Sequence, residues 1–168
     1  MVSLTAAGEV LVVIVSATAQ LNPPAWNLEY DVRNTGKIQI WLVVEESLRL
    51  QQDETHIELS YARGKMRPGT KVFGYFIPKV AGLLPGESLR QSIKVSWPCR
   101  LSDIWNAERE VALPIGEYDV SVRVGFGRTA EPESPKVAEE IEASVLRWQK
   151  EAVSQSVRIR IPPHALSE

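Results

Sequence analysis

Apolar and polar residues alternate without interruption over residues 26–33. One side of this segment carries only apolar residues: Trp26, Leu28, Tyr30 and Val32. The other side carries only polar residues: Asn27, Glu29, Asp31 and Arg33. The segment Asn34-Thr35-Gly36 follows and tolerates the positive φ angles of a tight turn. The pattern predicts a strand of an antiparallel sheet, with one buried face and one solvated face.

Similar patterns recur along the chain, separated by segments rich in glycine and proline. With residues 26–33, they predict strands at 9–20, 37–50, 55–61, 72–80, 88–97, 116–124 and 153–161. Residues 62–71 and 127–135 are predicted loops, and 98–114 is a long connection with a helical turn near residues 103–108. Most links are too short for parallel crossovers, which need a dozen residues or more.

The spacing of apolar residues changes after residue 135 from two to three and four. The apolar residues with this spacing are Val137, Ile141, Val145, Trp148 and Ala152. They form one stripe of an amphipathic helix over about residues 135–151. The whole pattern predicts a mainly β protein, an antiparallel β-sandwich of about eight strands with one amphipathic helix before the last strand. We expect one domain over residues 1–168, with a flexible tail at 162–168.

Composition and charge narrow the classes of partner. The chain has 168 residues, 19 basic and 21 acidic, with a formal net charge of −2. Because the basic residues are scattered and do not alternate with aromatic ones, the sequence does not predict nucleic-acid binding. The apolar run Val10–Val15 is too short to span a membrane. Cys99 is the only cysteine, so an intramolecular disulfide is excluded and a reducing compartment is favoured.

The amino-terminal region allows two interpretations. The run Val10–Val15 precedes Ala17-Thr18-Ala19, which is similar to a signal-peptidase site. However, no lysine or arginine precedes the run, and its β-branched residues and its length favour a buried strand. We therefore expect a cytoplasmic protein. The alternative is a periplasmic or secreted protein whose residues 1–19 are a signal peptide.

Three short segments resemble bacterial immunoglobulin-like domains. Residues 32–36 (VRNTG) are similar to the end of the second strand of such domains, and 84–88 (LPGES) to the turn before the fifth. Residues 113–120 (LPIGEYDV) are similar to the start of the sixth, where a tyrosine often closes the corner. The order and spacing resemble BsuPI-type intracellular proteinase inhibitors and fibronectin-like adhesion modules. The resemblance covers about residues 26–126 and implies an immunoglobulin-like sandwich; the helix and the 62–80 region depart from it.

Catalytic chemistry finds little support in the sequence. A cysteine hydrolase would need Cys99 beside a histidine, and the histidines are His56 and His164, the latter in the tail. No nucleophile motif surrounds Cys99. A single cysteine and two distant histidines do not predict a zinc site, and Asp53-Glu54 lacks the pattern of a calcium loop. The sequence therefore predicts no enzyme, no catalytic residue, no metal site and no cofactor.

Three apolar residues are candidates for binding a partner. Trp41 and Val43 lie on the face of their predicted strand opposite Ile40 and Leu42, where solvent is expected. Either this face is open for a partner, or the 135–151 helix covers it; the second interpretation is favoured because an amphipathic helix must cover an apolar surface. Trp105, in the 98–114 connection, is either a plug on the sandwich or an anchor for a partner.

These observations predict a non-catalytic β-sandwich module that binds another protein, as an adaptor or an inhibitor. Its contact regions would be end loops, with 62–71 and 98–114 as inhibitory-loop candidates, or an unpaired strand edge. A homodimer through a sheet edge or face is one form of this prediction. The alternative is a carbohydrate-binding module that uses exposed tryptophan.

Overall fold

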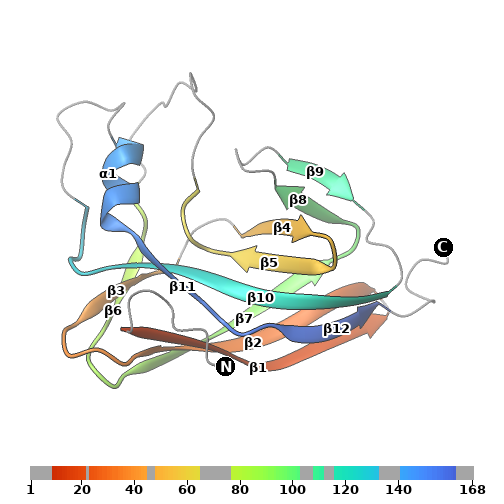
Figure 1. Ribbon diagram of the computed structural model, residues 1–168, viewed down its shortest axis with the longest axis horizontal. Coiled ribbons are helices and arrows are strands. Elements are labelled where there is room, and N and C mark those ends of the chain that lie inside the picture. Colours follow the sequence, from red (N-terminus) through yellow and green to blue (C-terminus); the bar gives the residue numbers. More distant parts are fainter. Residues whose placement is uncertain are drawn as a thin grey trace.

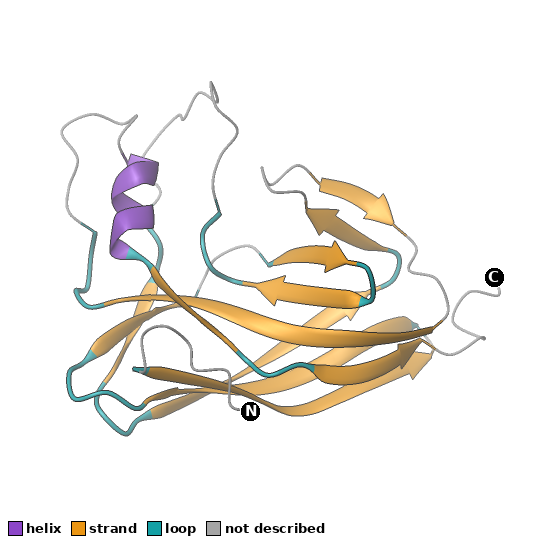
Figure 2. Ribbon diagram, in the orientation of Figure 1, coloured by secondary structure: helices purple, strands orange, loops and turns teal. Residues whose placement is uncertain are grey.

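The computed structural model describes residues 9–21, 23–44, 48–64, 77–102, 108–111, 116–132 and 141–161, with the backbone only for 141 and 142. The protein is mainly β, with strands gathered into separate sheets (Figure 2). The smaller main sheet has the order β1-β2-β7 and is antiparallel throughout. Its strands are β1 (Val10–Leu21), β2 (Pro24–Asn34) and β7 (Ser88–Ser96).

The larger main sheet has seven strands in the described part, with the path β4-β5-β10-β3-β6 and with β11 and β12 also paired to β10 (Figure 1). Its strands before β10 are β3 (Ile40–Val43), β4 (Arg49–Asp53), β5 (His56–Ser60) and β6 (Val80–Leu83). The others are β10 (Gly116–Gly127), β11 (Lys150–Val153) and β12 (Val157–Ile161). A separate hairpin contains β8 (Cys99–Ser102) and β9 (Glu108–Val111).

Strand β10 joins this larger sheet together. One of its edges pairs antiparallel with β12 and then β11. The other edge pairs with β5 and then, at Phe126 and Gly127, with β3. The pairing of β5 with β10 is parallel, from Asp119 opposite His56 to Arg123 opposite Ser60. The prediction of a wholly antiparallel fold is therefore wrong at this pair, because the long chain segment between the two strands allows a crossover.

The core lies between the two main sheets. The buried face predicted for β2 is confirmed. It carries Trp26, Leu28, Tyr30 and Val32, which are all buried in one cluster with inward residues of β10. The Trp26 ring meets Trp97 edge-on at a centroid distance of 5.2 Å and lies 6.1 Å from Tyr118. These aromatic contacts close the core at one end and join the two sheets.

The structure has more strands than the eight predicted, and the bounds of several differ. The predicted strand 37–50 contributes to both β3 and β4. The predicted connection 98–114 contains the β8–β9 hairpin, which the sequence did not indicate because Glu108, Arg109 and Glu110 are all exposed and do not alternate. The predicted loop 62–71 and strand 72–80 lie mostly outside the described residues.

The helix is shorter at its carboxyl end than predicted. Helix α1 spans Ile141–Trp148, and β11 begins at Lys150, within the predicted range 135–151. The chain becomes extended there because Ala152 is buried in the core opposite Val124 of β10. The predicted last strand, 153–161, is therefore divided between β11 and β12. The predicted tail 162–168 and the start of the predicted helix lie outside the described residues.

Candidate functional site

Trp41 occupies a gap between two glycines. It lies on β3, opposite Gly127 of β10 on one side and Gly82 of β6 on the other. A Cβ atom at Gly82 would lie 3.7 Å from the Trp41 Nε1, so the indole rests beside the bare backbone of β6. The Trp41 side chain is half-buried rather than open. Its role in binding a partner or a sugar stays a prediction.

Trp148, the last residue of helix α1, packs on the sheet beside Trp41. The Trp148 indole lies where a Cβ atom of Gly127 would project, and its Nε1 donates hydrogen bonds to the carbonyl (2.9 Å) and hydroxyl (3.0 Å) oxygens of Thr129. Figure 1 shows α1 at the end of β10 where β3 pairs. Val43, on the same face of β3 as Trp41, is only 1% exposed. Val43 is thus part of the interior and offers no surface to a partner.

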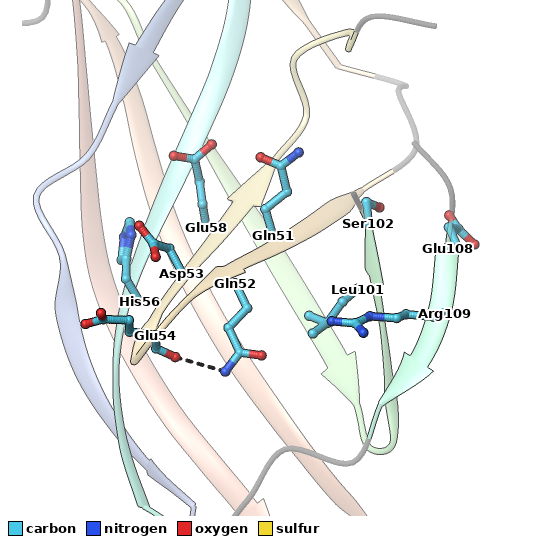
Figure 3. A pocket seen from close by; sticks show the side chains of 10 residues that line it. All are labelled: Gln51, Gln52, Asp53, Glu54, His56, Glu58, Leu101, Ser102, Glu108 and Arg109. Atoms are coloured by element: carbon cyan, nitrogen blue, oxygen red, sulfur yellow. Dashed lines mark hydrogen bonds between the residues drawn. The ribbon is translucent and has the colours of Figure 1, made fainter. Parts of the chain in front are cut away.

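Trp105, the third candidate, lies outside the described residues. The hairpin that flanks it on both sides, β8–β9, forms one wall of an open cleft. The β4–β5 hairpin forms the opposite wall (Figure 3). The cleft has a volume of about 750 Å³ and is lined mainly by polar side chains, among them Asp53, Glu54, His56 and Arg109.

Two polar side chains of this cleft, Glu58 and His56, bind residues of the neighbouring strand β10. The Glu58 carboxylate accepts two hydrogen bonds from Arg123, at 2.7 and 3.1 Å, and Arg123 also bonds Glu151 at 2.6 Å. These carboxylates raise the pKa of the Arg123 guanidinium, chiefly through the hydrogen bond to Glu58. The His56 Nε2 lies 2.8 Å from the Ser121 hydroxyl. This pair is poorly placed for nucleophilic catalysis, because Ser121 is only 2% exposed in the middle of β10.

Cys99 takes no part in the cleft. It is buried, and its thiol donates a weak hydrogen bond to the carbonyl oxygen of Val111 at 3.8 Å. Burial raises the pKa of the thiol, which keeps it in the unreactive neutral form. Within the described ranges, no group of three His, Cys, Asp or Glu side chains is arranged to hold a metal ion.

A different surface lies along β1. Leu11, Val13 and Val15 are 45%, 45% and 46% exposed, although their run was expected to form a buried strand. The strand prediction is confirmed, but only Val10 and Val12 of this run are fully buried. Leu11 and Val13 are exposed because they lie on the solvated face of the sheet, opposite Arg33 and Asp31 of β2. Among the described strands, β1 is also at the edge of its sheet and pairs only with β2.

The edge of β1 also presents main-chain groups. The Asn34 amide donates to the Glu87 carbonyl (3.0 Å) and the Asn34 carbonyl accepts from Gly86 (2.8 Å), on the β7 side of β2. Hydrogen-bonded positions alternate along an antiparallel pair, and Val12 and Ile14 lie an even number of positions from the partner of Asn34 on β1. Their amide and carbonyl groups therefore point away from β2.

Of the usual features that prevent edge pairing, the described strand β1 has a bulge but neither charge nor proline. The twelve residues of β1 include no charged residue and no proline. The register shifts between Ile14 and Ser16, which makes Val15 the extra residue of a bulge. The segment Leu11–Val15 thus combines three exposed apolar side chains with outward main-chain groups. We name this segment the β1 edge.

The sequence matches no protein-family model, no curated protein and no solved structure. In the part of the chain that the structure describes, no helix has the length and apolar character needed to cross a membrane.

Proposed function

We propose that the protein is a non-catalytic, immunoglobulin-like β-sandwich module that binds another protein through the β1 edge. The observation that carries the proposal is the row of three half-exposed apolar side chains, Leu11, Val13 and Val15, on an uncharged edge strand. An extended segment of a partner adds to such an edge by main-chain hydrogen bonds, and its side chains pack on the exposed row.

The other surfaces support binding less well. The cleft between the two hairpins is wide, and its Glu58 and His56 side chains already have partners within the protein. Trp41 is flanked by β6 and by the covered end of β10. The β1 edge, by contrast, exposes apolar groups, and their removal from water on binding would lower the free energy.

An affinity experiment tests the proposal. The full chain, immobilised as wild type, Val13→Lys or Leu84→Lys, is exposed to an extract of the source organism. Leu84 is the matched control, because it is 51% exposed and lies in the turn before β7. We expect a protein that binds the wild type and the Leu84→Lys variant and is lost with Val13→Lys. Equal retention by all three baits would refute binding through β1.

A further inference from the structure

We infer that the occupant of the β1 edge is a second copy of this chain, bound across a two-fold axis with the two β1 strands antiparallel. The inference rests on the proposed function, because it names the partner for the same surface. It is argued from the direction of the main-chain groups, the pairing of the side chains and the placement of charge on this edge.

The main-chain groups of the β1 edge are complementary to themselves. With the two-fold axis beside Val13, Val12 lies opposite Ile14 of the second copy, and Ile14 lies opposite Val12 of that copy. Val12 and Ile14 are the residues whose amide and carbonyl groups point away from β2. Each such pair exchanges two hydrogen bonds, so the two strands form a symmetric ladder of four.

The same register pairs the three exposed apolar side chains of the β1 edge with one another. Val13 meets Val13 of the second copy at a position without main-chain bonds, where side chains approach most closely. Leu11 meets Val15 on either side of the axis. A two-fold axis beside Val12 would instead set Ile14 opposite Val10 and Val15 opposite Glu9. The register about Val13 is therefore the one that sets every apolar side chain of the row beside another apolar side chain.

Electrostatic repulsion does not oppose the approach of two copies at the β1 edge. Strand β1 carries no charged residue. Glu9, just before it, is bound by Arg128 of the same chain. Asp31, which faces Val13 on β2, accepts hydrogen bonds from Arg90 at 2.8 and 3.0 Å. Two copies can therefore meet at β1 without bringing an uncompensated charge toward its own image, which would otherwise be costly.

The expected dimer is weak. One pair of short strands buries less than the roughly 800 Å² per partner of a standard stable interface, so we expect dissociation constants on the order of 10–100 μM. Self-association should be reversible and should depend on protein concentration.

Sedimentation velocity of the full chain, from micromolar to millimolar concentration, measures this association. We expect the wild type and Leu84→Lys to dimerise alike, and Val13→Lys and Val13→Glu each to stay monomeric because like charges meet at the axis. Mixing the two Val13 variants should restore a dimer, because lysine then faces glutamate. Circular dichroism and thermal unfolding of each variant establish that it is folded. A monomeric wild type at all concentrations, or unchanged association of Val13→Lys, would overturn the inference.

A cross-linking experiment tests the register separately. Opposed residues at a position without main-chain bonds have Cα atoms about 4.5 Å apart, which is within the range that a disulfide spans. Mild oxidation of Val13→Cys should therefore give a covalent dimer on a non-reducing gel, whereas Leu84→Cys should not. Cross-linking of Leu84→Cys at the same rate would contradict a specific pairing at β1.

Failure of the dimer and failure of the proposed function give different results. If the wild type is monomeric but the affinity experiment shows a different protein lost with Val13→Lys, the dimer is wrong and the proposed function stands. If Val13 variants change neither self-association nor retention of any protein, both are wrong.

Discussion

The side-chain amide of Asn34 donates a hydrogen bond of 2.9 Å to the carbonyl oxygen of Leu83, which lies on a different sheet. The same amide donates to the Ile38 carbonyl at 2.8 Å, and the Asn34 side-chain oxygen accepts from the Gly36 amide at 3.0 Å. Asn34 is fully buried. One side chain therefore connects the turn after β2 to the end of β6.

Replacement of Asn34 by alanine should destabilise the protein by about 2–4 kcal/mol, because it removes the donor of the buried bond to the Leu83 carbonyl and of the part-buried bond to the Ile38 carbonyl. Urea unfolding measures the change. Asn27→Ala, on the same strand, is the matched control: Asn27 is half-buried and makes one side-chain bond, of 3.3 Å, to Gln20. Its cost should be below about 1 kcal/mol. Similar losses for the two variants would contradict the role of Asn34.

Replacement of Gly127 by alanine should displace helix α1, because the new Cβ atom would overlap the Trp148 indole. We expect a loss of about 1–3 kcal/mol in the free energy of unfolding. In a double-mutant cycle, Gly127→Ala should cost much less in a Trp148→Ala background. Gly36→Ala, whose Cβ would have contacts of 3.4 Å, is the control with room for the methyl group. Additive losses would show that Trp148 does not pack on Gly127.

The carboxyl group of Asp31 should titrate below its ordinary pKa of 3.8, because Arg90 hydrogen-bonds its charged form. A lowered pKa in the folded state means that the pair stabilises the protein above pH 3.8, and that this contribution is lost as pH falls through the folded value. Carboxyl NMR titration measures the pKa directly. Arg90→Gln should raise it toward 3.8, whereas Arg33→Gln, on the same sheet face, should not. An Asp31 pKa insensitive to Arg90→Gln would argue against the pair.

The thiol of Cys99 should react slowly with iodoacetamide at mildly alkaline pH, because burial both shields it and raises its pKa. A raised pKa in the folded state stabilises the protein below the ordinary pKa of 9.0, and this contribution is lost as pH rises through the folded value. Mass spectrometry of the alkylated chain gives the rate. The same chain in concentrated urea is the control and should react rapidly. Equal rates would mean that the thiol is accessible in the folded protein.

Local pattern was sufficient for strands whose two faces differ. Apolar and polar residues alternate over Trp26–Val32 because one face of β2 packs on the core and the other faces solvent. Consecutive residues are enough to reveal this difference between the two faces. The parallel pairing of His56–Ser60 with β10 is not written there, because it depends on contacts between segments distant in the chain. Similarly, Ala152 satisfies a helical spacing and a strand position equally well, and tertiary packing decides between them.

The β1 edge could be predicted only in part. An unbroken run such as Val10–Val15 is compatible with burial on both faces, and alternation cannot say whether a strand lies at the centre or the edge of its sheet. Leu11 and Val13 are exposed because they lie on the solvated face of their sheet, opposite Arg33 and Asp31 of β2. The placement of Trp41 between two glycines was likewise beyond local pattern, since Gly82 and Gly127 come from distant segments.

The central position of β10 has a consequence for folding during synthesis. When the ribosome has synthesised the chain as far as Ser96, all three strands of the smaller sheet are present, together with β3 and β5. In the described sheet, β10 (Gly116–Gly127) lies between the pairs β3–β6 and β4–β5. These pairs are therefore synthesised before the strand that joins them, and until then each has an unpaired edge. We expect the nascent chain to depend on chaperones until β10 has left the exit tunnel, and then to complete its larger sheet from both sides.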